Sequence, residues 1–295
     1  MWVLERRFRR ALEELVSDYQ GRDWRVRSAR DLSDLACHPC AVVSDGSGAV
    51  FVKYSEAADA GRQFEIERES LRFLSRKTGV LTPKPLGIVP AGDGTLFVME
   101  AVQAIERGPR AWREIGRTLA RIHRVTSDAY GFRMDTYFGP LVQDNAAMDD
   151  WASFYAERRL RSRLRFAVDA GHMPSSVAAQ VEAVIDRLPE LSGPETPPTL
   201  VHGDAQQNNF MSTADGTYVI DPAIYYGHPE VDLAFVGYWE PVPDEVFEGY
   251  REERAMAPGF GERRELWRLS GYLAAVAVEG AAYLGMLTEA LRGYV

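Results

Sequence analysis

Three polar residues that could bind and transfer a phosphoryl group follow short apolar segments in the second half of the chain. Asp204 comes after the run TLV and His202-Gly203, Asn209 lies five residues later, and Asp221 ends the segment TYVI. Phosphoryl transfer needs a carboxylate that accepts the proton of the attacking hydroxyl and oxygen ligands that hold a metal ion on the phosphates. We therefore predict Asp204 as the catalytic base, and Asn209 and Asp221 as ligands of Mg²⁺.

Turn formation is the alternative explanation, because Asp, Gly and Asn favour turns after strands. Either motif alone would be explained in this way. Both motifs together, in this order and on strands that we expect to be linked by a hairpin, favour catalysis. His202 and Asp232 are predicted to support the catalytic loop. Asp232 opens a helical segment and could cap it, but we favour a brace through backbone N–H groups of that loop.

A lysine at the end of an apolar strand could bind the α- and β-phosphates of ATP. Lys53 ends the strand AVFVK, and the helical segment after it carries Glu65, Glu67 and Glu69. One of these glutamates is expected to pair with Lys53, while the other two lie on a solvated face. The nucleotide site is therefore predicted to include Lys53 and one partner carboxylate.

Residues near position 100 are predicted to join two lobes and to hold adenine through their backbone groups. This interpretation of Glu100 and Val102 rests on their position alone. A glycine-rich phosphate loop is missing, since the segment SARDLSDLACHPC contains no glycine. Backbone N–H groups or Ser33 could contact the phosphates there, or this edge of the site is open. Cys37 and Cys40 in that segment are interpreted as packed thiols in preference to a redox pair.

The expected architecture is α+β and bilobal, with a small antiparallel-sheet N-lobe at 1–100 and a larger, mainly helical C-lobe at 101–295. Hairpin signals, alternation and helical periodicity carry this prediction. The strands of the N-lobe are expected within 24–32, 40–55 and 82–102, and its helices within 1–19 and 57–79.

The net charge and the distribution of apolar residues limit the classes of partner that we expect the protein to bind. The net charge of −9 makes a nucleic acid an unsuitable partner. The apolar segment 269–287 carries Glu279 and is expected to form a buried helix, so no membrane association is predicted. We expect a cytoplasmic monomer or homodimer.

The chain resembles the fructosamine (ketosamine) kinase family, within the aminoglycoside-phosphotransferase-like branch of the protein-kinase fold. VFVKYS with FEIERESLRFL, and above all IDPAIYYGHPEVDLA, carry the resemblance. It implies ATP and Mg²⁺ as cofactors, a small sugar-containing acceptor, and Glu67 as the partner of Lys53. The family's H-G-D-L-W-x-G-N loop reads HGDAQQNN here, with Gln206 at the Trp position and Asn208 at the Gly position.

Several acidic, amide and aromatic residues of the C-lobe could contact the acceptor. Helix capping and packing are the competing explanation for most of them. The candidates are Gln206, Gln207, Asp149, Asp150, Trp151, Glu230, Trp239 and Glu240.

Three functions are compatible with these residues. The first is a kinase for a sugar hydroxyl, with a ketosamine as the implied acceptor. The second is a phosphotransferase that inactivates an aminoglycoside or a sugar-bearing nucleoside antibiotic. The third is a nucleotide-binding pseudokinase. It is disfavoured because the residues whose loss would mark such a protein are all present, namely Lys53, Asp204, Asn209 and Asp221. A protein kinase is disfavoured because only ten residues separate Asp221 from Asp232, too few for an activation segment.

Overall fold

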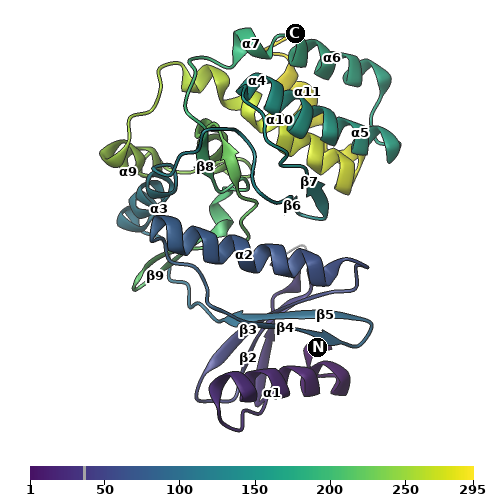
Figure 1. Cartoon of the computed structure of the whole chain (residues 1–295), viewed down its shortest axis with the longest axis vertical. Coiled ribbons are helices and arrows are strands. Elements are labelled where there is room, and N and C mark those ends of the chain that lie inside the picture. Colours follow the sequence, from purple (N-terminus) through teal and green to yellow (C-terminus); the bar gives the residue numbers. More distant parts are fainter. Residues whose placement is uncertain (36–37) are drawn as a thin grey trace.

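The computed structural model describes residues 1–35 and 38–295, which form a small sheet-containing part and a larger helical part (Figure 1). The sheet is antiparallel, and its five strands are arranged in the order β1-β2-β3-β5-β4. This architecture confirms the α+β fold predicted from the sequence. The strands are β1 (Ser28–Asp31), β2 (Cys40–Ser44), β3 (Ala49–Ser55), β4 (Pro85–Ala91) and β5 (Gly94–Glu100).

Two helices cover the opposite faces of this sheet. Helix α1 (Arg6–Gln20) packs one apolar face, which includes Phe8 and Leu12, against inward-facing valines of β2 and β3. Helix α2 (Ala60–Thr78) packs on the other face and lies between the sheet and the helical part (Figure 1). Successive side chains of a strand point to opposite faces, so alternate apolar residues of β5 contact different helices. Strand β3 is central in the sheet, which holds Lys53 in a rigid position.

The helical part contains one large core, to which most of its helices contribute apolar residues. A continuous helical stretch combines α4, a π-helical turn and α5. The bounds are α3 (Pro109–Ile122), α4 (Trp151–Phe154), the π-helical turn η3 (Tyr155–Arg161), α5 (Ser162–Asp169), α6 (Ser175–Asp186), α7 (Leu188–Leu191), α8 (Glu230–Phe235), α9 (Glu245–Glu253), α10 (Phe260–Glu279) and α11 (Leu284–Leu291), with short 3₁₀ turns η1 (Trp2–Leu4), η2 (Ser33–Leu35), η4 (Gln207–Asn209) and η5 (Ala281–Tyr283).

The apolar segment 269–287 is not the single helix that its composition predicts. Helix α10 ends at Glu279, because Gly280 adopts a φ of 94° that residues with a side chain rarely adopt. The chain then turns and continues as α11. Among the described residues, none of the helices combines the length and apolarity that a bilayer crossing requires.

Three two-stranded ribbons lie in the helical part. Strand β9 (Phe210–Thr213) pairs with β10 (Gly216–Val219), and β6 (Thr136–Phe138) pairs with β7 (Leu141–Gln143). Strand β8 (Thr199–Val201) pairs with β11 (Tyr225–Gly227). The expected hairpin between the strands that precede Asp204 and Asp221 is therefore wrong. The β9–β10 hairpin instead separates Asn209 from Asp221, and brings both to one end of the ribbon.

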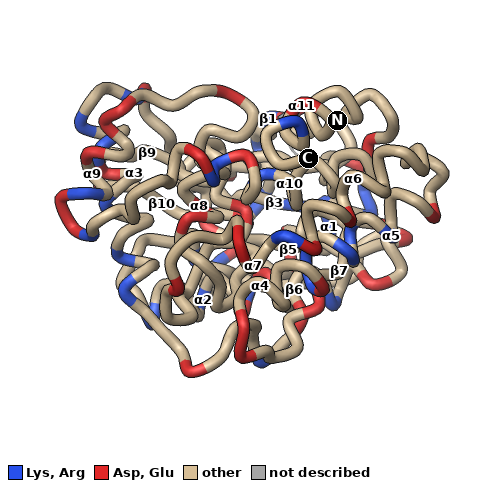
Figure 2. The backbone as a smooth tube through the Cα atoms, turned by 90° about the horizontal axis from the view of Figure 1, so that it is seen from above, with Lys and Arg blue, Asp and Glu red and all other residues tan. Residues whose placement is uncertain are grey.

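Charged residues are distributed over both parts of the molecule. Acidic and basic positions are interspersed along the backbone as seen from above (Figure 2). Many of them form ion pairs on helix surfaces, such as Arg10 with Glu14 on α1 and Arg113 with Glu252 between α3 and α9.

Candidate active site

An ion pair joins the sheet to the helical part. The Lys53 ammonium lies 2.8 Å from Glu67 Oε1 and also contacts Asp221 Oδ1. Burial alone would lower the pKa of Lys53, but the Asp221 and Glu67 carboxylates raise it, so the side chain stays charged. The structure therefore brings together Lys53, its expected helix partner and the expected metal ligand.

Asp204 lies on the loop between β8 and β9 with its carboxylate next to two amide side chains. Gln206 Nε2 is 3.3 Å from each carboxylate oxygen, and Asn209 Nδ2 is 3.2 Å from Oδ2. Burial raises the pKa of Asp204 to about 7, although the amide hydrogen bonds and the more distant Arg163 oppose the shift. A carboxyl group with such a pKa suits a general base near neutral pH.

Asp232 holds the backbone of the loop that carries Asp204 through hydrogen bonds. Its two carboxylate oxygens accept the N–H groups of His202 (2.6 Å) and Gly203 (3.0 Å). This is the contact that the sequence analysis expected. Gly203 has a φ of 81°, and a Cβ there would lie 2.1 Å from the Ala223 carbonyl oxygen. Only glycine fits this approach of the catalytic loop to the metal-binding loop.

His202 links the two loops through its ring. Nε2 lies 2.9 Å from the Ile220 carbonyl oxygen, and Nδ1 accepts the Asp204 N–H at 3.2 Å. These partners require a neutral ring with the proton on Nε2. Burial lowers the pKa of His202, which favours the same neutral form. His202, two residues before Asp204, is therefore held in a fixed orientation in the protein interior.

A second buried network behind Asp232 was not predicted from the sequence. His123 at the end of α3 places Nε2 3.0 Å from Asp232 Oδ2, and Tyr250 of α9 places its hydroxyl 2.9 Å from His123 Nδ1. Helices α3 and α9 approach closely because Gly116 and Gly249 face each other's backbones. The three side chains lie far apart in the sequence, so no local pattern could reveal the network.

Arg107 is a further residue that the sequence analysis missed. Its Nη2 donates to the carbonyl oxygens of Gln207 (2.9 Å) and Phe210 (2.7 Å), and its guanidinium stacks on Trp112. Burial lowers the pKa of Arg107. The side chain therefore clamps the outer side of the loop that carries Asn209.

The expected metal ligands present the hard oxygen atoms that Mg²⁺ prefers. Asn209 donates its amide N–H to the Asp204 carbonyl oxygen (2.7 Å), which leaves Oδ1 available. Asp221 contacts Lys53 through Oδ1, and 39% of its side chain is exposed. Its φ of 52° places the residue in the left-handed region. Within the described residues, no cluster of three His, Cys, Asp or Glu side chains could hold a metal.

The predicted adenine-binding residues lie where the sheet ends. The Glu100 N–H already donates to the Lys84 carbonyl oxygen at 2.9 Å, so only the Glu100 carbonyl could serve adenine. Among the described residues, the Val102 N–H has no hydrogen-bond partner. These roles stay a prediction.

The glycine-free segment between β1 and β2 is only partly described. Ser33 Oγ donates to Asp31 Oδ1 at 2.6 Å, which makes it part of a local turn. Cys40 is buried with a free thiol, whereas Cys37 lies outside the described residues. His38, which the sequence analysis did not select, is near Lys53 and Asp221: burial and Lys53 lower its pKa, and Asp221 raises it.

Three of the predicted acceptor residues lie beside the catalytic loop. Gln206 contacts Asp204, and Gln207 Nε2 donates to the Glu240 carbonyl oxygen at 3.2 Å. Trp239, next in sequence to Glu240, has 43% of its surface exposed and packs edge-on against Tyr238. These residues remain candidates for acceptor binding.

Asp150, Trp151 and Glu230 have structural contacts instead. The Asp150 carboxylate caps α4 by accepting the Ser153 N–H. Trp151 is buried in an aromatic cluster. Glu230 is only 2% exposed and is held by Arg263 and the Trp267 indole N–H. Burial places both side chains in packing contacts, and the Glu230 carboxylate is already paired with Arg263 and Trp267, so acceptor binding by Trp151 and Glu230 stays a prediction without support from these contacts.

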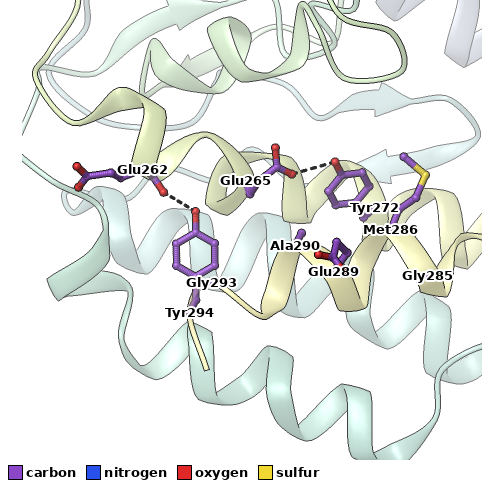
Figure 3. A pocket seen from close by; sticks show the side chains of 9 residues that line it. All are labelled: Glu262, Glu265, Tyr272, Gly285, Met286, Glu289, Ala290, Gly293 and Tyr294. Atoms are coloured by element: carbon purple, nitrogen blue, oxygen red, sulfur yellow. Dashed lines mark hydrogen bonds between the residues drawn. The ribbon is translucent and has the colours of Figure 1, made fainter.

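A cavity of about 600 Å³ lies elsewhere, between α10 and α11. Figure 3 shows Tyr294 and Tyr272 hydrogen-bonded to the Glu262 carbonyl and the Glu265 carboxylate along this cavity. None of the catalytic-loop residues lines it. It is a surface feature of the C-terminal helices and does not belong to the candidate site.

Comparison with known proteins decides the family. The fructosamine kinase family model matches residues 9–295, almost the whole chain. The chain belongs to the fructosamine kinase family. Membership makes it an ATP-dependent phosphotransferase with an alcohol group as acceptor, and confirms the resemblance that the sequence motifs indicated.

Relatives and solved structures extend over the same length. A probable ketoamine kinase of Synechocystis sp. is 28% identical over 285 residues and covers 95% of both chains. The mouse ketosamine-3-kinase is 29% identical over 272 residues, which cover 83% of this chain and 87% of the mouse protein. A provisionally named fructosamine-3-kinase from Thermobifida fusca YX-ER1 superimposes with a TM-score of 0.83 and 31% identity, covering 96% and 98% of the two chains.

The fold also extends to antibiotic-modifying enzymes. A thermostable mutant of the aminoglycoside phosphotransferase APH(4)-Ia, solved with ADP and hygromycin B, has a TM-score of 0.63 at 15% identity and covers 96% of this chain. This likeness shows a shared fold between fructosamine kinases and these enzymes. It confirms the kinase-like fold predicted from the sequence.

Proposed function

We propose that this fructosamine kinase transfers the γ-phosphate of ATP to a sugar hydroxyl of a ketosamine, with Asp204 as the general base. The proposal rests on one observation. Strands and loops that are far apart in the sequence bring four polar side chains close together, namely Lys53, Asp204, Asn209 and Asp221. The names of the relatives, ketoamine and ketosamine kinases, support the acceptor class.

Each side chain has one task in this mechanism. Lys53, kept charged by its carboxylate neighbours, binds the nucleotide phosphates. Asp204 accepts the proton of the acceptor hydroxyl, while Gln206 and Asn209 keep its carboxylate oriented. Asp232 fixes the loop backbone, so little reorganisation is needed during transfer.

Asn209 Oδ1 and the Asp221 carboxylate are proposed to hold Mg²⁺, which when bound neutralises charge on the phosphate oxygens. The N-lobe at 1–100 would then supply the nucleotide contacts, including the Glu100 carbonyl and the Val102 N–H. The C-lobe at 101–295 would supply the base, the metal ligands and the acceptor contacts.

An acceptor screen tests this function. The purified protein is incubated with Mg²⁺-ATP and with fructosyl and ribulosyl derivatives of lysine and glycine, and products are detected by mass spectrometry. Hygromycin-type aminoglycosides and sugar-bearing nucleosides form the comparison set. We expect a mass gain of one phosphoryl group on the ketosamines. Transfer to the antibiotics alone would replace the ketosamine proposal with the antibiotic alternative.

A further inference from the structure

His38 lies near the end of the glycine-free segment, two residues before the first residue of β2, and its ring reaches the face of the sheet that carries Lys53. The ring contacts the Phe64 ring of α2 edge-on, with a centroid distance of 5.7 Å. Phe64 packs on Phe97, and Phe97 is the residue opposite Lys53 where β3 pairs with β5. Residues directly opposite each other point to the same face of a sheet. His38 and Lys53 therefore lie on the same side of the sheet, the side that α2 covers.

Backbone pairing with β3 fixes the chain next to His38. Cys40 is the cross-strand partner of Lys53. The Pro39 carbonyl oxygen accepts the Tyr54 N–H at 2.9 Å, so the pairing of the two strands continues to the residue beside His38. The imidazole is therefore attached to a backbone that starts two residues from the partner of Lys53.

Helix α2 holds the ring from the other side. Phe64, which contacts the ring of His38, lies three residues before Glu67, so the two side chains are neighbours on one helix face. Glu67 Oε1 lies 2.8 Å from the Lys53 ammonium. The strand and the helix both place the imidazole beside this ammonium group. The pKa of His38 agrees with this position, because burial and Lys53 lower it and Asp221 raises it.

The imidazole of His38 is not used by the protein itself. Within residues 1–35 and 38–295, its ring nitrogens have no hydrogen-bond partner, and the ring is half-buried. Ser33, the other side chain of this segment that the sequence analysis considered for phosphate contact, already donates to Asp31. A histidine ring carries at least one N–H in either protonation state. His38 therefore offers a donor next to a buried lysine and an expected metal ligand.

We propose that the His38 imidazole donates a hydrogen bond to an oxygen of the β- or γ-phosphate of ATP, and that this side chain takes the place of a glycine-rich loop. This inference rests on the proposed function. Lys53 is expected at the α- and β-phosphates, and Asp221 at the metal ion that the β- and γ-phosphates share. A donor beside both residues faces the outer phosphates. Hydrogen bonds to such charged oxygens are among the strong ones.

Nucleotides that differ in phosphate number test this assignment. In His38→Leu, which removes the donor, the Kd for Mg²⁺-ATP should rise by about 10- to 100-fold, the usual loss for a hydrogen bond to a charged group. The Kd for AMP, which has neither outer phosphate, should change by less than about twofold. His38→Gln keeps an N–H at similar reach and should bind Mg²⁺-ATP at least about threefold more tightly than His38→Leu. Calorimetry measures all three quantities.

Asp34→Asn is the control, because Asp34 lies exposed in the same segment, four residues before His38. It should leave the affinity for both nucleotides within about twofold of the wild type. Unchanged ATP binding in His38→Leu would overturn the assignment. Equal losses for ATP and AMP would also overturn it, since they would show a general change in the site.

The wild-type protein provides a second measurement that needs no folded leucine variant. The chain has five histidines, so the imidazole signals in a nitrogen-15 correlation spectrum are few, and His38→Gln identifies the signal of His38. Mg²⁺-ATP should move this signal further than AMP does, because only ATP carries the outer phosphates. Equal shifts with the two nucleotides would overturn the assignment.

Both measurements are made without an acceptor, which separates this inference from the proposed function. A selective loss of ATP affinity in His38→Leu, combined with a wild-type protein that phosphorylates none of the ketosamines, would contradict the ketosamine proposal and support the His38 contact. Normal ketosamine phosphorylation in His38→Leu with an unchanged KM for ATP would overturn the His38 contact and leave the proposed function intact.

Discussion

Lys53 and Asp221 lie 168 residues apart in the sequence and form one ion pair that joins the central strand of the sheet to the loop after β10. Glu67 holds the lysine from the other side. Both carboxylates contact the same ammonium group, so the position of each of the three charged side chains depends on the other two. The pair also fixes the distance between the expected phosphate contact and the expected metal ligand.

Lys53→Met should lower kcat/KM for ATP by about 100-fold or more, because removing one member of a buried ionic cluster leaves the others uncompensated. Glu67 and Asp221 would then repel each other across the vacant position. Initial-rate kinetics with varied ATP measure the effect. Lys77→Met, at an exposed lysine near the end of α2, is the control and should match the wild type. A Lys53→Met enzyme with normal kinetics would remove Lys53 from the nucleotide site.

Asp204→Asn should lower kcat by about 10²- to 10⁴-fold, which is the usual contribution of a general base. The amide keeps the size of the side chain, so Mg²⁺-ATP affinity should change little. Single-turnover transfer and nucleotide titration measure the two quantities. Asp215→Asn, in the exposed turn between β9 and β10, is the matched control. Full turnover in Asp204→Asn would contradict its assignment as the base.

The raised pKa of Asp204, about 7, has two consequences for pH dependence. The base must be ionised, so kcat/KM should rise with pH through about 7 and then level off. The folded pKa exceeds the unfolded one, so the stabilising contribution of the protonated carboxyl is present below the unfolded pKa and is lost as pH rises through about 7.

Asp204→Asn removes this pH-dependent loss. The difference in Tm between variant and wild type should therefore grow in favour of the variant from about pH 5 to about pH 8. Thermal unfolding across that range measures it. A Tm difference that is constant with pH would show that the carboxyl is ionised with an ordinary pKa.

Asp221→Asn should abolish the increase in ATP affinity that Mg²⁺ produces. Asparagine suits this test better than alanine, because the backbone at this position has a φ of 52° and Asn adopts such angles readily. The loss can then be attributed to the carboxylate. ATP titrations with Mg²⁺ and with EDTA measure it, and an unchanged Mg²⁺ effect would exclude Asp221 as a ligand.

Gly249→Ala should destabilise the protein by about 1–3 kcal/mol, the usual cost of overpacking. A Cβ at this position would lie 2.0 Å from the Arg113 carbonyl oxygen of α3. Gly261→Ala, in α10 where the space around a Cβ is open, is the control and should be neutral or stabilising by up to about 1 kcal/mol. Denaturant unfolding of both variants measures the contrast. Equal effects would show that the helix crossing tolerates a methyl group.

Local spacing was enough to select residues that the structure brings together in the candidate site. The Asp204–Asn209 spacing, the position of Asp221 after a strand and the Lys53 strand followed by a glutamate-rich helix are visible in one short window each. Strand alternation and turn signals likewise predicted the sheet. Each of these features depends only on residues that are close together in the sequence, so it can be recognised from the sequence alone.

Residues whose role depends on distant partners could not be predicted. Arg107 and His123 contact the loop region only after the chain has folded, and neither stands in a distinctive pattern. Trp151 and Glu230 were selected by residue type, which does not reveal that both side chains are buried in the structure. The break at Gly280 was missed because a single glycine in an apolar run does not by itself end a helix.

The close crossing of α3 and α9 has a consequence for engineering this enzyme. Replacing helical glycines by alanine is a common route to thermostable variants. Here Tyr250 follows Gly249 directly and reaches the catalytic loop through His123 and Asp232. A methyl group at this crossing would therefore displace Tyr250 and, through His123 and Asp232, the backbone of the loop that carries Asp204. A search for stabilising substitutions by helix propensity alone would disturb the candidate active site at this point.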